Sequence, residues 1–258
     1  MGWSLAYSDE FFKQAASFET FQTASGPIKV PTLYGDVIAM AVLFSVSMKK
    51  TRKLLPTEKL KPISLGRGKA ICGLTCFEYR DSTIGKYNEV GFGIPCLYNP
   101  LINIPVLPAL LDRHFPVVFY ISHLPVTTKF AFDFGTEVWG YPKFLAEIRF
   151  EESEDTRRCI LRADNRNILT LEVHKGKKLK PDRWDLKTIT VKDNTPLTTT
   201  MNTRGELWAS RSANSASLSL GDHPLSDELR SLELDTRPLK TMYYPKMQAI
   251  LNAPKALH

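Results

Sequence analysis

The sequence predicts a mainly β fold, a β-rich α+β domain with a barrel-like or two-sheet architecture. Most apolar residues fall in short runs of strand composition, and turns rich in Glu, Asp, Lys and Asn separate these runs at the spacing of antiparallel meanders. Few segments show helical periodicity. The 258 residues have ordinary globular composition, 43% hydrophobic and 24% charged, without a linker, repeat or low-complexity block. We therefore expect one domain over residues 1–258.

The first half of the chain opens its regular structure with a long apolar, β-branched run over residues 36–46. Ser47 then fits the N-cap of a short amphipathic helix that Pro56 stops. Further strands are expected over residues 70–79, 88–96 and 117–121. Residues 127–138 are ambiguous, and one interpretation is a helix that ends near Gly140. The Pro-rich stretch 97–115 looks like an excursion from the sheet.

The second half continues the meander of short strands. The lysine-rich run 175–180 has turn composition, and we expect it at a solvated hairpin tip. The expected elements are strands over residues 145–151, 158–163, 168–174, 188–192 and 198–210, a helix over 222–232, and a closing strand over 241–252.

The formal net charge is +7, but the positive residues lie in scattered short runs rather than on one module. No nucleic-acid-binding motif accompanies them, so nucleic-acid binding is the weakest of our functional hypotheses. The N-terminus lacks a signal-peptide core, and no apolar run is long enough for a membrane helix. Cysteines 72, 76, 96 and 159 form no CxxC pair, and reduced core thiols favour a cytoplasmic location.

Several common catalytic motifs are missing from the sequence. There is no GxSxG nucleophile elbow, no GxGxxG, and no histidine spacing typical of a metal site, and the SLGRGK segment at 64–69 lacks phosphate-loop spacing. We therefore expect neither a metal nor an organic cofactor. His123 ends an apolar strand, where a hydrogen-bonded structural histidine is the favoured interpretation; it is also a candidate for substrate binding.

One lysine stands out by its setting. Residues 135–146 read GTEVWGYPKFLA, which places Lys143 behind a Gly-Tyr-Pro turn. The Pro142 ring restrains the backbone, and Trp139, Tyr141 and Phe144 could form apolar walls. Burial or a nearby cation disfavours the ammonium form of a lysine, and the neutral amine can attack a ketone. Residue type alone still favours a structural lysine.

Several segments taken together resemble the acetoacetate decarboxylase superfamily. The 135–146 segment is similar to the family pattern G-[RT]-E-x-x-[GA]-[YF]-P-K-K-L. Upstream, residues 87–90 (YNEV) match the family's Y-x-E segment, and residues 51–56 (TRKLLP) resemble a short helix ending in R-x-[LV]-[LV]-P. The late helix and closing strand match in order, so the resemblance covers roughly residues 28–255.

The resemblance implies a cone-shaped β-barrel with a few short helices that assembles into a homo-oligomer, a dimer or tetramer. It implies that Lys143 forms a Schiff base with a keto acid or related carbonyl substrate, the imine serving as electron sink without a cofactor. Glu89 matches the active-site glutamate that positions substrate or moves a proton. Tyr141, Phe144, Trp139 and His123 are then candidate substrate-binding residues, and Glu137 is expected to hold the turn.

Two departures from the family pattern bear on activity. The decarboxylases carry a second lysine after the reactive one, where this chain has Phe144, so any activation of Lys143 must come from desolvation. They also place an arginine early in the chain for the substrate carboxylate, and residues 30–41 contain none. We expect a divergent lyase of decarboxylase or aldolase/dehydratase type; the alternative is a non-catalytic small-molecule-binding protein that retains the barrel pocket.

Overall fold

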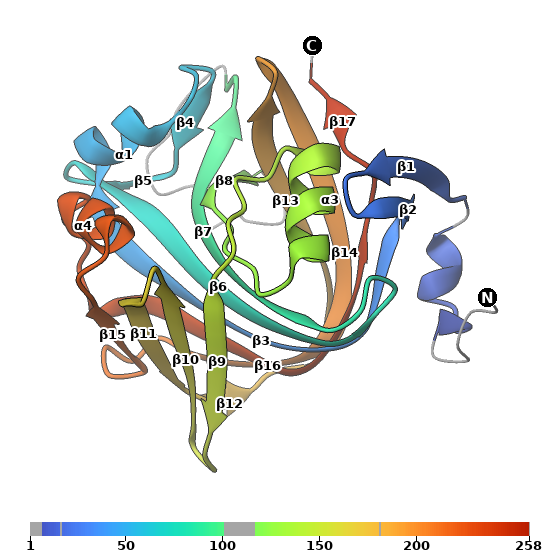
Figure 1. The fold of residues 1–258 in the computed structure, drawn as a ribbon. Helices are drawn as coiled ribbons and strands as arrows, with labels where there is room; N and C mark the ends of the chain where they lie inside the picture. Colours follow the sequence, from blue (N-terminus) through green and yellow to red (C-terminus); the bar gives the residue numbers. More distant parts are fainter. Residues whose placement is uncertain (1–6, 16, 101–116, 181, 258) are drawn as a thin grey trace.

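The computed structural model describes residues 7–15, 17–100, 117–180 and 182–257, and within them the chain is dominated by strands (Figure 1). The prediction of a mainly β, barrel-based fold is confirmed. The strands are β1 (Glu19–Thr23), β2 (Gly26–Val30), β3 (Thr32–Ser47), β4 (Leu60–Pro62), β5 (Ser64–Gly66), β6 (Lys69–Ser82), β7 (Tyr87–Tyr98), β8 (Val117–His123), β9 (Glu147–Glu152), β10 (Thr156–Ala163), β11 (Arg166–His174), β12 (Lys177–Lys178), β13 (Asp182–Lys192), β14 (Thr195–Ser210), β15 (Ala216–Leu220), β16 (Pro238–Leu251) and β17 (Lys255–Ala256).

Among the described strands, seven close into a barrel in the order β7-β8-β13-β14-β16-β3-β6, because β6 also pairs with β7. Strands β8 and β13 are parallel, and the other neighbours in the ring are antiparallel. A second sheet of four strands, in the order β15-β11-β10-β9, lies beside the barrel, and β1 and β2 form a separate hairpin. Closure leaves the seven barrel strands without an unpaired edge.

Strand β3 is buried on both faces of the barrel wall, which explains its continuous apolar run. Successive side chains of a strand point to opposite faces. Val37 and Ala39 belong to an apolar cluster inside the barrel, whereas Ile38 and Met40 belong to a second cluster shared with the four-stranded sheet and the late helix. A strand with one solvated face would alternate apolar and polar residues; this strand does not.

Three α-helices lie among the described residues, α1 (Met48–Leu54), α3 (Lys129–Trp139) and α4 (Pro224–Ser231), with one short 3-10 turn at Phe12–Gln14. The prediction of Ser47 as N-cap of α1 is confirmed, although its side chain makes no capping hydrogen bond. Helices α1 and α4 lie together on one flank, and α3 crosses the barrel on another (Figure 1). None of these helices has the length and apolar character needed to cross a membrane.

The predicted strands and helices are largely confirmed, and most extend beyond their expected ends. The ambiguous 127–138 stretch is the helix α3, and residues 222–232 contain α4. The lysine-rich run 175–180 is not a free hairpin tip, because Lys177 and Lys178 form β12 on the edge of β14. Most of the expected excursion at 97–115 lies outside the described residues; Leu97 and Tyr98 still belong to β7.

The four cysteines are all buried and free. Cys72 and Cys76 lie on β6, Cys96 on β7 and Cys159 on β10. Burial raises the pKa of the Cys72 thiol to about 12, so this thiol stays protonated and packs as a small apolar side chain.

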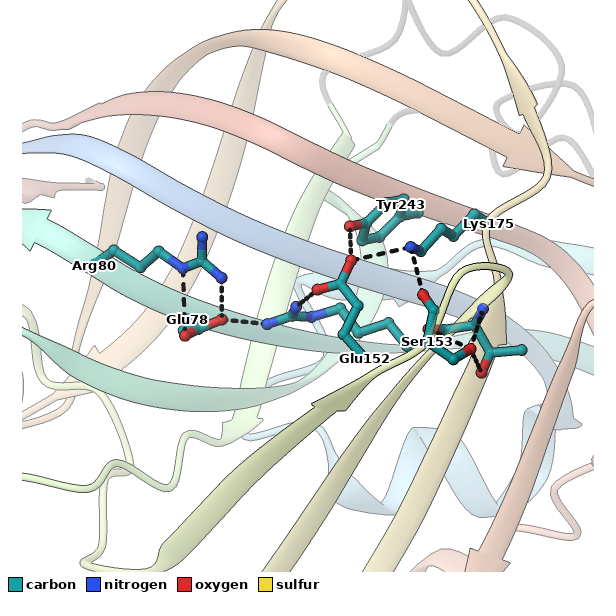
Figure 2. A network of polar contacts seen from close by, with 8 residues as sticks. Glu78, Arg80, Glu152, Ser153, Lys175 and Tyr243 are labelled. Atoms are coloured by element: carbon teal, nitrogen blue, oxygen red, sulfur yellow. Dashed lines mark hydrogen bonds and ion pairs between the residues drawn. The ribbon is translucent and has the colours of Figure 1, made fainter.

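A polar network that includes Glu78, Glu152 and Tyr243 links the four-stranded sheet to the outer face of the barrel (Figure 2), and a buried arginine lies at its centre. The Arg157 side chain on β10 is 2% exposed, and its guanidinium contacts the carboxylates of Glu78 on β6 and Glu152 on β9. The ring of Phe150 lies 4.6 Å from the guanidinium carbon. Tyr243 donates a hydrogen bond of 2.7 Å to Glu152, which extends the network to β16. One cation thus connects both sheets.

We predict that Arg157→Ala lowers the free energy of unfolding by about 3 kcal/mol, because two carboxylates lose their buried partner. The matched control is Arg158→Ala, whose side chain is 45% exposed and pairs with Glu151 and Glu172 at the surface. That substitution should cost less than about 1 kcal/mol. Urea unfolding followed by tryptophan fluorescence measures both, and equal losses would contradict the structural role of Arg157.

Candidate active site

A cavity of about 60 Å³ lies inside the barrel. Each of the seven barrel strands contributes at least one side chain to it, and α3 supplies further residues from one side. On β7 the residues Tyr87, Glu89 and Gly91 alternate into the cavity, whereas Val90 and Phe92 point to the outer cluster. The alternation of strand side chains therefore places the carboxylate of Glu89 in the barrel interior.

The end of α3 delivers Lys143 to the same cavity. Gly140 follows the helix at φ 65°, a left-handed conformation that suits glycine, and its N–H donates to the carbonyls of Gly135 and Thr136. The chain then runs extended beside the residues after β8: Leu124 N–H donates to Pro142 O, and Val126 N–H donates to Phe144 O. These backbone bonds fix the direction in which each side chain of the segment points.

Gly135 leaves the space through which the Lys143 side chain passes. A Cβ atom at position 135 would lie 2.1 Å from Lys143 Cε and 2.6 Å from Cδ. Carbon atoms do not approach so closely, so any larger residue must displace the lysine. The glycine at the start of the GTEVWGYPK segment is thus required by packing against the lysine, eight residues later.

The amine of Lys143 is buried against the carboxylate of Glu89. The Nζ–Oε2 distance is 2.6 Å, and the two side chains are 3% and 8% exposed. Tyr79 donates a hydrogen bond of 3.2 Å to the other carboxylate oxygen, Oε1. The rings of Tyr87, Phe134 and Tyr141 lie with their centroids 5.7–5.9 Å from Nζ, a distance at which aromatic faces attract a cation.

Four tyrosines line the cavity as neutral phenols. Burial raises the pKa of Tyr141 to about 12, and burial together with the negative charge of Glu89 raises the pKa of Tyr34 and Tyr79 far above the usual value. Burial likewise raises the pKa of Tyr87. The Tyr34 and Tyr87 hydroxyls share a hydrogen bond of 3.1 Å, and those of Tyr141 and Thr188 share one of 2.8 Å. The site therefore offers hydroxyl groups without additional charge.

The structure brings four of the six predicted site residues to the cavity, Lys143, Glu89, Trp139 and Tyr141. Phe144 is not among the lining residues; it packs against the outer apolar cluster. His123 does not line the cavity either. Its Nε2 lies 3.7 Å from Glu228 on α4, its ring contacts Phe92 edge-on, and burial lowers its pKa. These contacts match the structural interpretation of His123.

The sequence did not predict Tyr34, Tyr79 and Tyr87 as cavity-lining residues, although Tyr87 belongs to the Y-x-E segment. The Tyr79 ring lies between the other two, with centroids 4.5 Å apart in each tilted pair. Strand alternation could have indicated Tyr87, because it lies two residues before Glu89 on β7 and therefore faces the same side of the strand. Glu137 does not hold its own turn; its carboxylate accepts a hydrogen bond from Ala24 N–H in the β1–β2 hairpin.

Within the described chain, no cluster of three or more His, Cys, Asp or Glu side chains could hold a metal.

Comparisons with known proteins identify the fold and the family of the chain. Among curated proteins, none matches the sequence significantly. Solved structures with the same fold include an acetoacetate decarboxylase (18% identity, TM-score 0.63, covering 88% of this chain and 89% of the other). Another is the acetoacetate decarboxylase of Legionella pneumophila subsp. pneumophila str. Philadelphia 1 (16% identity, TM-score 0.65, covering 88% of this chain and 87% of the other). An acetoacetate decarboxylase-like enzyme from Sphingomonas wittichii RW1 is also similar (13% identity, TM-score 0.58, covering 88% of this chain and 92% of the other).

A further solved structure of this fold is the enduracididine biosynthesis enzyme MppR, complexed with the condensation product of pyruvate and imidazole 4-carboxaldehyde (12% identity, TM-score 0.58, covering 88% of each chain). At these identities the likeness shows the fold. The family model of acetoacetate decarboxylase (ADC) matches residues 20–252, nearly the whole chain. The chain therefore belongs to the acetoacetate decarboxylase family.

Proposed function

We propose that this protein is a Schiff-base-forming lyase that acts on a small carbonyl compound, with Lys143 as nucleophile and Glu89 as its proton partner. The observation that carries the proposal is the 2.6 Å contact between the two buried side chains at the wall of an internal cavity. A lysine used only for stability does not need open space beside its amine. Family membership supports an enzymatic role, and the fold-related MppR with its bound condensation product supports carbonyl chemistry in this barrel.

Condensation requires the amine to lose one proton, and Glu89 is in direct contact to take it. Transfer from Nζ to Oε2 leaves a neutral amine beside a neutral acid, so the net charge of the cavity does not change. The amine then adds to the carbonyl carbon. The protonated Glu89 returns its proton to the carbinolamine hydroxyl, and water leaves to give a protonated imine beside the Glu89 carboxylate.

The protonated imine is the electron sink for the next step. It can accept the electron pair of a bond to the α-carbon, released either as CO₂ departs or as an α-proton moves to a base. Glu89 is again the nearest base, since the imine nitrogen occupies the position of Nζ. The surrounding rings of Tyr87, Phe134 and Tyr141 stabilise the positive charge, as they do that of the ammonium.

Borohydride reduction tests the covalent step. With a panel of small ketones and keto acids, at least one compound should leave a reduced adduct on Lys143 that peptide mass spectrometry locates. The Lys143→Met variant should show no adduct at that position. Lys129→Met, which removes an exposed lysine of α3, is the control and should leave the label intact. If no compound labels Lys143 in the folded protein, the non-catalytic binding alternative is preferred.

Glu89→Gln tests the proton partner. The amide keeps the shape of the side chain but cannot accept the α-proton, so we expect α-hydrogen exchange of a bound ketone in D₂O to slow about 10²–10⁴-fold. Proton NMR of the substrate measures the exchange rate. Glu147→Gln, an exposed glutamate on β9, should leave the rate unchanged. Undiminished exchange in Glu89→Gln would assign the base to another group.

Gly135→Ala tests the passage of the lysine past α3. The new methyl group must displace Cε of Lys143, so borohydride labelling should fall strongly while the fold persists. The matched control is Gly73→Ala on β6, where a Cβ atom would first meet Leu43 Cδ2 at an ordinary 3.4 Å. Circular dichroism and thermal unfolding verify that both variants fold. Full labelling of Gly135→Ala would contradict the observed lysine position.

A further inference from the structure

The charged side chains around the cavity restrict which carbonyl compounds can form an imine with Lys143. This inference rests on the Schiff-base proposal above. Among the described lining residues, the only charged side chains are Glu89 and Lys143, and each is the other's partner. The remaining lining is aromatic, aliphatic, methionine, threonine or glycine. We infer that the substrate is an uncharged aldehyde or ketone with an apolar body, and not a keto acid.

The balance of charge during condensation leads to this substrate class. With an uncharged ketone, the protonated imine replaces the ammonium and remains paired with Glu89. A keto acid would add a second carboxylate to the same cavity, so that two negative charges would share one cation. An unpaired buried charge is strongly unfavourable, and the described lining contains no arginine or second lysine to pair with it.

The hydroxyl groups of the cavity do not substitute for a cation. Tyr79 already donates to Glu89, and Tyr141 is bonded to Thr188. The hydroxyls of Tyr34 and Tyr87 are joined by a single hydrogen bond, which leaves one O–H of the pair to donate elsewhere. The Tyr141–Thr188 pair, in which either hydroxyl can be the donor, likewise keeps one O–H. These neutral donors suit a carbonyl or hydroxyl oxygen on the substrate body, but they supply no positive charge to pair with a carboxylate, which presents about four lone-pair sites.

The substrate class also sets the reaction class. A substrate without a carboxylate cannot lose CO₂, so the imine loses an α-proton to Glu89 and becomes an enamine. The enamine carbon either regains a proton or attacks the carbonyl carbon of a second uncharged molecule. In the second case one carbon–carbon bond forms, the carbonyl π bond breaks, and the new alkoxide takes the proton held by Glu89. Water then adds to the imine and releases product and free amine. The atoms balance in this aldol sequence without an oxidant, reductant or cofactor.

The test compares two methyl ketones of similar shape, acetoacetate and 2-pentanone. In 2-pentanone an ethyl group stands where acetoacetate has its carboxylate. Borohydride labelling of Lys143 is measured for each and divided by the labelling of Nα-acetyllysine, which corrects for intrinsic reactivity. We expect 2-pentanone to label about tenfold or more efficiently, from the penalty on an unpaired buried carboxylate. Equal or stronger labelling by acetoacetate overturns this inference and leaves the Schiff-base proposal standing. Absence of label from both compounds overturns this inference, and the Schiff-base proposal falls with it only if the whole panel of carbonyl compounds also leaves Lys143 unlabelled.

A variant with an added cation sharpens the comparison. Leu186 on β13 lines the cavity and is partly exposed, so a longer side chain can be accommodated there. Leu186→Arg should move the labelling ratio toward acetoacetate by about tenfold, because the guanidinium pairs with the carboxylate. Leu186→Gln, polar but uncharged, should keep the preference for 2-pentanone. A ratio that shifts equally in both variants would show that size or polarity, and not charge, decides the preference.

Discussion

The buried contact between Lys143 and Glu89 is the interaction on which the site depends. Neither charge could remain alone inside the barrel, since an isolated buried charge is far less stable than one in water. Together, at 2.6 Å, they form a pair without net charge. The barrel must therefore present both groups at once. Alternation along β7 supplies the carboxylate, and the ordered end of α3 supplies the amine.

The position of α3 is fixed from outside the cavity by several independent contacts. Ala24 and Ser25, in the β1–β2 hairpin, bond to the carboxylates of Glu137 and Asp133 on the outward side of the helix. At its C-terminal end, the indole of Trp139 donates to the carbonyl of Asn252, and Thr190 donates to the carbonyl of Trp139. Small movements of α3 would change the gap at Gly135 directly. The hairpin thus controls lysine placement without touching it.

Much of the fold follows from local sequence, whereas the composition of the site does not. The apolar run of β3 and the Gly-Tyr-Pro turn are local signals, and the structure contains both the strand and the turn. Phe144 was expected at the pocket because it adjoins Lys143, yet that adjacency is why it points away. In the extended segment after Gly140, Tyr141 and Lys143 face the cavity and the next residue faces outward. To predict that Tyr34, Tyr79 and Tyr87 lie together, one must know which strands become neighbours, and no local sequence pattern gives that information.

Neither the identity nor the direction of residue 144 adds charge to the site. The Phe144 ring packs among apolar residues between the barrel and the four-stranded sheet, where a charged side chain would lack a partner. Within the described lining, the environment of the amine is then set by one carboxylate and three aromatic rings. Those groups stabilise a single positive charge and leave no cation to receive a second anion. The described lining thus holds one cation and one anion, a balance that an uncharged substrate leaves intact.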